Sequence, residues 1–344
     1  MTGEGHQDES EITPSQFAFF LTRTEQLKDQ HRVFNLTPQD FKLLNPNTQT
    51  CPIFRTREDA ELTKKIYQRV PILINEKTGA NPWGVSFLRM FDMAIDSHLF
   101  KTRTELETLG FHLFGNRMVK GEEIYLQLYE GKMFMQYDHR YADVIIKDNL
   151  KRPGQVDIVS EEKHQNPIFI PIPRFWVRLK EIYTKIAINY KWLIGFKNVT
   201  SPTNERTFLK AIIPLAAVGN SIPLINSKIN PNLQSILVGN ANSLILDFIT
   251  RQKMGNINLN FYLVQQLPVL PPEFYTPSDI IFIVPRVLEL TYTAWDIKAF
   301  ADDVWRDADE YLRGVLREQW EENKRITGGH EWEPPEWAEI EENG

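Results

Sequence analysis

Apolar residues recur every three or four positions along the N-terminal third of the chain, which is the spacing of a helix with one buried face. This spacing predicts a first helix over residues 17–27. A second helix is predicted after Thr37, its N-cap, with Pro38 at its first position. A third is predicted to follow Thr56 and to end before Pro71, because proline cannot continue a helix. Turn-rich loops separate these helices.

The pattern changes to short apolar and alternating runs in the middle of the chain, which is typical of strands. Residues 125–146 predict a strand, a break at Gly131-Lys132, and a second strand with alternating aromatics. Further extended segments are predicted at residues 167–177, 191–200 and 208–218, the first of them at a sheet edge because of its prolines.

Helical spacing returns over residues 232–254, 284–305 and 310–325, before an acidic tail. These patterns together predict an α+β protein in three parts. A helical and loop-rich N-terminal connector is expected at 1–115, a central β-rich domain at 116–286, and a C-terminal helical, acidic segment at 287–344.

Length and composition fit a globular protein of the cytoplasm. A chain of 344 residues with 42% hydrophobic residues can bury a sizeable core. The single cysteine, Cys51, excludes an internal disulfide framework and a cysteine-based zinc site. No apolar run approaches the roughly 20 residues that span a bilayer, and the polar, acidic start does not resemble a signal peptide. We therefore expect a cytoplasmic protein without a membrane partner.

Charge is distributed unevenly along the chain, although the net charge is only -6. Residues 171–253 contain eleven Lys and Arg against three acids, whereas residues 287–344 contain sixteen acids against six Lys and Arg. A basic middle beside an acidic tail is the pattern expected when a polyanion binds one region. A solvated basic face is the simpler alternative.

The sequence contains no Gly-rich phosphate loop, no HExxH, no GxSxG and no Cys/His cluster. Asp138, His139 and Arg140 could act as acid, base and anion binder, although a His among aromatic residues more often has a structural role. Glu161 and Lys163, with Asp143 or Asp157 upstream, resemble the carboxylate and lysine arrangement of Mg²⁺-dependent nucleases.

The basic region also contains aromatic residues and side-chain amides. Lys and Arg bind phosphates, while Asn, Gln and Arg can read base edges in the major groove. Most aromatics in such a region belong to the core. The mixture favours DNA over an acidic protein as the partner.

Ordered blocks covering nearly the whole chain resemble a known family. They are NPNTQTCPIFRTREDAELTKKIYQRVPIL, NPWGVSFLRMFDMAIDSHLF, LYEGKMFMQYDHRYA, TNERT, AVGNSIPLI, LDFITRQKMGNINLNFYLVQQLPVLPP and RVLELTYTAWDIKAFA. In these blocks the chain resembles the C-terminal, target-recognition half of type IIG restriction-modification enzymes, which are fused adenine-specific DNA methyltransferases. The resemblance implies that the β-rich part, 116–286, is a DNA target recognition domain.

The resemblance does not extend to the catalytic half of that family. Its methylase motif is of the Asn-Pro-Pro-Tyr type, and none of the four Asn-Pro pairs in this chain continues with a second proline. No methyl-donor glycine loop is visible either. We therefore expect no catalytic residue, no metal ligand and no cofactor in this chain, with S-adenosylmethionine bound by a methylase on another domain or subunit.

The stretch SPTNERTFLKAIIPLAAVGNSIPLI, residues 201–225, is expected to face the DNA under this interpretation. Residues 203–207 would form a loop at a strand edge, and Gly219 would bring the backbone close to the duplex or to a packed neighbour. The full set of expected DNA contacts is Lys132, Gln136, His139, Arg140, Asn204, Arg206, Thr207, Asn220, Asn242, Gln252 and Lys253.

Two other functions remain open at the level of sequence. One is a Mg²⁺-dependent nuclease that uses Asp143, Glu161 and Lys163. The other is an assembly subunit that docks on a separate methylase through its C-terminal helices. Target recognition for a restriction-modification or phage-defence methyltransferase is the reading that the residues favour.

Overall fold

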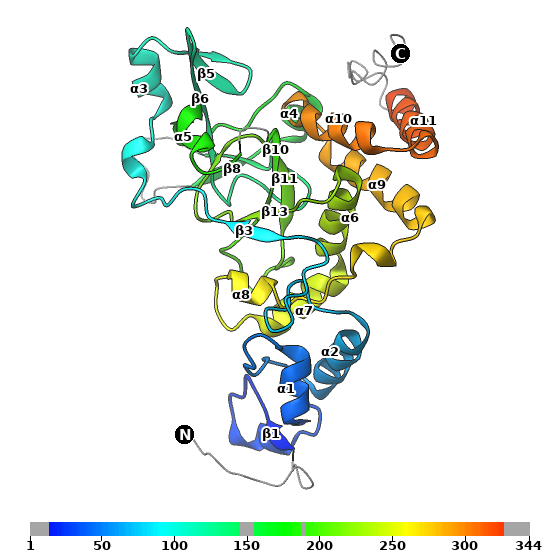
Figure 1. The fold of residues 1–344 in the computed structure, drawn as a ribbon. Helices are drawn as coiled ribbons and strands as arrows, with labels where there is room; N and C mark the ends of the chain where they lie inside the picture. Colours follow the sequence, from blue (N-terminus) through cyan, green and yellow to red (C-terminus); the bar gives the residue numbers. More distant parts are fainter. Residues whose placement is uncertain (1–13, 145–154, 188–189, 327–344) are drawn as a thin grey trace. The chain divides into compact units, whose positions relative to one another are not determined.

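The computed structural model describes residues 14–144, 155–187 and 190–326 (Figure 1). Helices and several small sheets are mixed along the chain, so the predicted α+β class is confirmed. The chain divides into two compact units, each assembled from three segments. Unit 1 comprises Met1–Pro82, Thr200–Thr207 and Leu244–Pro271, and unit 2 comprises Trp83–Val199, Phe208–Ser243 and Pro272–Gly344. The boundaries expected after residues 115 and 286 both fall inside unit 2.

Unit 1 combines a small sheet with short helices. The two predicted N-caps are confirmed: the Thr37 hydroxyl accepts the Asp40 N–H at 3.2 Å, and the Thr56 hydroxyl accepts the Asp59 N–H at 3.1 Å. The described elements of this unit are β1 (Ser15–Phe17), η1 (Thr24–Lys28), β2 (Phe34–Leu36), α1 (Pro38–Leu44), α2 (Arg57–Arg69), α7 (Leu244–Lys253) and α8 (Phe261–Val264).

The helix predicted over residues 17–27 is wrong. Phe17 belongs to strand β1 and pairs with Phe34 of β2. The centroid of its ring also lies 5.8 Å from that of Phe41, within an aromatic cluster that includes Phe34. Apolar positions at helical spacing therefore serve a tertiary cluster here, and only the short 3₁₀ helix η1 forms.

Backbone contacts between distant segments close unit 1. The Leu73 N–H donates to the Leu267 carbonyl at 2.8 Å, and the Ile74 N–H donates to the Gln265 carbonyl at 2.9 Å. The buried Tyr67 hydroxyl, on α2, donates to the Gln266 carbonyl at 2.7 Å. The segment after α2 is thus joined to the segment after α8.

Unit 2 contains two larger sheets and a two-stranded one, nearly all antiparallel. The strands of the first are ordered β11-β10-β13-β3 and those of the second β12-β6-β5-β4, with β9 also paired to β6. Their bounds are β3 (Ser86–Leu88), β4 (His112–Phe114), β5 (Arg117–Lys120), β6 (Glu123–Tyr129), β7 (Ala142–Val144), β8 (Val156–Ile158), β9 (Trp176–Arg178), β10 (Trp192–Phe196), β11 (Lys210–Pro214), β12 (Ala217–Val218) and β13 (Leu224–Asn226).

The prediction of two strands over residues 125–146 is only half right. The first strand is β6, but residues 133–140 form tight turns before the short β7. The Met133 N–H donates to the Glu130 carbonyl, the Met135 N–H donates to the Asp138 carbonyl, and Tyr137 has a φ of +65°. Turns therefore replace most of the second predicted strand, and of its aromatic residues Phe134 is buried while Tyr137 and Tyr141 are partly exposed.

A large apolar cluster joins the sheets of unit 2. Its buried members include Phe91, Leu128, Phe134, Ile213 and Leu224. The remaining helical elements of the unit are η2 (Ser97–Leu99), α3 (Arg103–Thr108), α4 (Glu161–Gln165), α5 (Leu179–Tyr183), α6 (Pro231–Ala241), η3 (Pro272–Phe274), α9 (Pro277–Thr291), η4 (Trp295–Ile297), α10 (Lys298–Asp307) and α11 (Glu310–Ile326).

Gly195, in β10, has no room for a side chain. A Cβ there would lie 2.5 Å from Ile222 Cγ2, inside the packed core. We predict that Gly195→Ala lowers the free energy of unfolding of unit 2 by about 1–3 kcal/mol, since an overpacked core must shift. Gly314→Ala, in α11 with nothing within 4 Å of the new Cβ, should instead stabilise by up to about 1 kcal/mol. Urea unfolding of both variants tests this, and equal effects would contradict it.

Candidate nucleic-acid interface

The polar loop of residues 200–207, in unit 1, is a compact turn with its own internal hydrogen bonds. The hydroxyls of Ser201 and Thr203 lie 2.7 Å apart, and the Asn204 N–H donates to the Ser201 carbonyl at 3.1 Å. At the base of the loop the Thr200 hydroxyl donates to the Thr207 carbonyl at 2.8 Å. The residues Ser, Pro, Thr and Asn favour such turns because their side chains bond nearby backbone groups.

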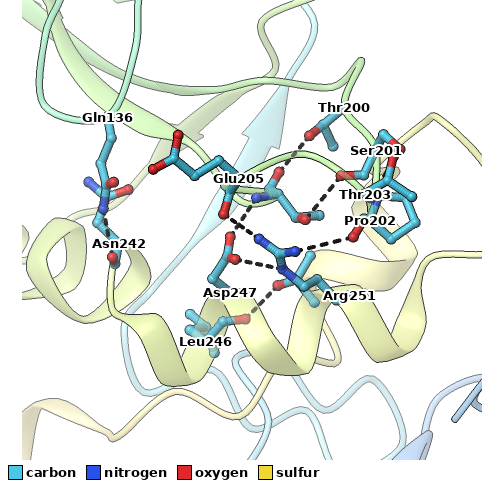
Figure 2. A network of polar contacts seen from close by, with 12 residues as sticks. Gln136, Thr200, Ser201, Pro202, Thr203, Glu205, Asn242, Leu246, Asp247 and Arg251 are labelled. Atoms are coloured by element: carbon cyan, nitrogen blue, oxygen red, sulfur yellow. Dashed lines mark hydrogen bonds and ion pairs between the residues drawn. The ribbon is translucent and has the colours of Figure 1, made fainter. Parts of the chain in front are cut away.

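Two side chains of α7 hold this loop from below (Figure 2). The Arg251 guanidinium donates to the Pro202 carbonyl at 3.3 Å and to the Glu205 carbonyl. Its Nε lies 2.9 Å from the buried carboxylate of Asp247, whose other oxygen accepts the Thr207 N–H at 2.6 Å. The loop backbone is therefore fixed by charge-assisted hydrogen bonds.

The fixed loop exposes the side chains of Thr203, Asn204 and Glu205 to solvent. Arg206 is partly buried, and Thr207 is fully buried, with its hydroxyl donating to the Ser201 carbonyl at 3.1 Å. Of the predicted contacts in this stretch, Asn204 has an exposed side chain and Arg206 a partly exposed one. Thr207 is corrected to an anchor of the loop.

The second part of the predicted stretch, Gly219 to Ser221, approaches the protein's own strands. The Gly219 N–H donates to the Tyr129 carbonyl at 2.9 Å, and a Cβ on Gly219 would lie 3.2 Å from Met93 Sδ. The Asn220 amide, partly exposed, donates to the Asp92 carboxylate at 3.0 Å. A packed neighbour accounts for the small residues at this step.

Lys132 and Gln136 each have a partner within unit 2. Lys132 forms an ion pair with Glu130 at 2.9 Å, and the Gln136 amide donates to the Asn242 carbonyl at 2.7 Å. The Asn242 side chain is buried and pairs with the backbone N–H and carbonyl of Lys210, both at 3.2 Å. Asn242 is therefore a structural residue after α6, and its predicted DNA contact is corrected.

His139 and Arg140 are completely buried, which also corrects their predicted role. The Arg140 guanidinium donates to four backbone carbonyls of unit 2, those of Asn166, Phe169, His164 and Thr293, at 2.7–3.2 Å. Burial lowers the pKa of Arg140, while Asp296 and Asp138 favour its charged form. His139 Nε2 lies 2.8 Å from Asp296 Oδ1. Neither side chain reaches the surface where a phosphate could bind.

Gln252 and Lys253, at the end of α7, are buried as well. The Lys253 amine donates to the Leu44 carbonyl at 2.6 Å and to Asn45 Oδ1 at 2.5 Å, and it lies 4.7 Å from the Tyr67 ring centroid. The Gln252 carbonyl accepts the Ile53 N–H at 3.0 Å. The two residues attach α7 to the N-terminal segment of unit 1, so the expected extension of a basic surface is not found there.

The residues of the nuclease hypothesis are only partly brought together. Lys163 Nζ lies 2.9 Å from Asp143 Oδ2, and Asp143 pairs with Asp157 across β7 and β8. Asp143 Oδ1 accepts the Ile172 N–H at 2.7 Å. In the part of the chain that the structure describes, no three His, Cys, Asp or Glu side chains form a group that could hold a metal ion. The positive charge beside the Asp143 carboxylate is therefore that of Lys163.

Asp247 and Arg251 are the two functional residues that the sequence analysis missed. Their spacing of four places both side chains on one face of a helix, which is a detectable signal. Their target, a loop more than 40 residues earlier in the chain, has no such signal.

Removal of the Asp247 carboxylate should loosen the loop without unfolding the chain. We predict that Asp247→Ala increases the exchange rate of the Thr207 amide and destabilises unit 1 by about 1–3 kcal/mol, because a buried N–H and the Arg251 cation lose their acceptor. Hydrogen exchange read by NMR measures the first effect and urea unfolding the second. Glu61→Ala, which removes an exposed carboxylate on α2 that pairs with the partly buried Lys64, is the control and should change neither by more than about 0.5 kcal/mol. Unchanged protection of Thr207 would contradict the anchoring role.

Lys253 should make the stability of unit 1 depend on alkaline pH. Burial lowers its pKa to about 7, below its value of about 10.4 in an unfolded chain. Between these values the unfolded state binds more protons, so stability should rise with pH by up to about 1.4 kcal/mol per pH unit. Urea unfolding between pH 7 and 10 measures this slope, which Lys253→Met should abolish. An equal slope in both proteins would contradict it.

In comparisons with known proteins, no family model and no curated protein matches this chain. Among the residues that the structure describes, no helix has the length and apolar character needed to cross a membrane.

Proposed function

We propose that this chain recognises a sequence in double-stranded DNA and positions a methylase on it, as the target recognition part of a restriction-modification or phage-defence methyltransferase. The sequence blocks that resemble type IIG enzymes motivate the proposal. The observation that carries it is the loop of residues 200–207, whose backbone is fixed by α7 while its tip is open to solvent.

Preorganisation of this kind suits a contact loop. A loop that is already ordered loses little conformational entropy on binding, so more of its interaction energy appears as affinity. The Arg251 cation and the Asp247 carboxylate do this ordering from below the loop. The exposed side chains of Asn204 and Glu205 are then accessible to a partner.

The chemistry of the tip matches base edges better than phosphates. Asn204 supplies an amide that can pair with both polar atoms of an adenine edge, and Glu205 supplies a carboxylate that can accept a hydrogen bond from the amino group of cytosine. Thr203 adds a hydroxyl. A carboxylate would be repelled by the DNA backbone, so this tip fits a groove.

Phosphate contacts would come from exposed cations of the basic segment. The exposed lysines of unit 2 in this segment are Lys180, Lys185, Lys191 and Lys228. The other cations of this region are partly exposed (Arg174, Arg178, Lys197, Arg206 and Arg251) or buried (Lys210 and Lys253). Such contacts supply affinity that does not depend on sequence.

Methyl transfer itself belongs to another domain or chain under this proposal. The chain lacks the Asn-Pro-Pro-Tyr type of motif that would hold the target amino group, and S-adenosylmethionine would bind beside that motif on the methylase. The cytoplasm, where chromosomal DNA lies in bacteria, is the expected compartment.

A selection from a randomised duplex library at low salt, followed by gel-shift titration, tests the proposal. We expect one enriched sequence, and an affinity that falls steeply and linearly in a plot of log K against log salt. Asn204→Ala should reduce discrimination at one base pair by about 1–3 kcal/mol, whereas Gln68→Ala, an exposed amide on α2, should leave it unchanged.

Three outcomes separate the proposal from its competitors. Absence of duplex binding at low salt, with and without a methylase partner, would refute it. Co-purification with a methylase without DNA affinity in either state would select the assembly subunit. Plasmid cleavage that needs Mg²⁺ and disappears in Glu161→Ala would select the nuclease.

A further inference from the structure

A hollow of about 650 Å³ opens in unit 2. Its wall is built from the β4–β5 turn, residues 167–170, the end of α5, Tyr190 and Lys191, the end of β11, and η4. The volume lies within the range of small-molecule and cofactor sites, roughly 300–1,000 Å³. No residue of the proposed recognition loop lines it.

The lining combines three aromatic side chains with two cations. Tyr183, Tyr190 and Trp295 are partly exposed in the hollow, together with Arg117 and Lys191. In the described part of the chain neither cation has a carboxylate partner. A planar apolar group and an anionic group would therefore both find complementary surfaces there.

The aromatic wall is held in place by the core and by backbone hydrogen bonds. Tyr183 and Tyr190 also pack against the large apolar cluster of unit 2. The Trp295 N–H donates to the Pro167 carbonyl at 2.9 Å, and the Leu215 N–H donates to the Lys191 carbonyl at 3.1 Å. These contacts fix the backbone that carries the aromatic and cationic groups.

The one acid of the lining is a buried carboxylate with a buried cation nearby. The Asp296 side chain is only 4% exposed, and its Oδ1 lies 2.8 Å from His139 Nε2 behind the wall. Arg140, completely buried, contributes a positive charge that interacts with the same carboxylate. The accessible charge of the hollow is therefore that of Arg117 and Lys191.

We propose that this hollow binds a single nucleotide. The base stacks on the aromatic side chains and packs against Ile168 and Leu215, and the phosphate binds Arg117 and Lys191. The same chemistry is offered by a free mononucleotide and by one nucleotide that has left the stack of a DNA strand. Because the hollow is separate from the recognition loop, the inference holds whether or not the chain reads duplex DNA.

Calorimetric titration of the full chain at low salt tests the inference, with dAMP, inorganic phosphate and a 12-nucleotide poly(dA) single strand as the probes. We expect dAMP or the strand to bind more tightly than phosphate, because stacking of the base adds affinity. Tyr190→Leu should weaken that binding about tenfold. The double variant Arg117→Gln, Lys191→Gln should weaken it by at least about tenfold.

Arg286→Gln is the matched control, since Arg286 is an exposed cation of unit 2 that does not line the hollow and has no proposed DNA contact. It should bind dAMP and the strand as the wild type does. Circular dichroism of each variant checks that the fold is kept. Because Arg117 and Lys191 are exposed, we expect the double variant to fold as the wild type does.

Each result decides the question. Binding of dAMP identifies a free nucleotide as a ligand, and binding of the strand alone identifies a nucleotide within DNA. Binding of neither, equal affinities for dAMP and phosphate, or wild-type affinity in the double variant would overturn the inference. If the wild-type chain selects no duplex sequence but binds dAMP, the recognition function is refuted and the nucleotide site is supported.

Discussion

A buried charge must be compensated by its own chain, and this constraint decides which basic residues of the protein are at the surface. Arg140 is completely buried, and its two terminal nitrogens donate to four backbone carbonyls, including that of Thr293. Lys253 is held in the same way by Leu44 and Asn45. Removal of either side chain would strand the carbonyls it serves, which is costly in an interior of low polarity. These two basic side chains organise the fold and are not available to a partner.

Helix caps can be predicted from the sequence because their physical cause is local. Thr37 and Thr56 cap their helices through the N–H three residues later, so the neighbouring residues suffice to predict them. The strand β10 also follows from a short pattern, whereas the single helical segment expected over residues 232–254 is two helices, α6 and α7, which belong to different units. The helix expected at residues 17–27 failed because its phenylalanines serve a tertiary aromatic cluster with Phe34 and Phe41. No window of sequence around Phe17 contains that information.

The role of each basic residue could not be predicted for a related reason. His139 and Arg140 occur in a polar, aromatic stretch that is typical of a binding surface, but their partners Asp296 and Thr293 come more than 150 residues later. Lys253 and Leu44 are separated by 209 residues. Composition counts a cation as positive surface wherever it lies, whereas only the fold determines its burial. Conversely, no sequence pattern marks Tyr183 and Arg117 as site residues, although the arrangement of β5 and α5 places both in the lining of one hollow.

Charged side chains hold the loop backbone, and mostly uncharged polar groups occupy its tip. This arrangement is better suited to specific recognition than to non-specific attraction of a polyanion. The buried Asp247 and the partly exposed Arg251 use their charges on the backbone of the loop, so the loop tip is left with neutral donors and acceptors and the single carboxylate of Glu205. A surface built only to attract a polyanion would place its cations at that tip. A tip with directional hydrogen-bonding groups on a fixed backbone discriminates between partners by leaving a mismatched polar group unpaired. That property suits a protein whose partner is defined by a sequence of bases.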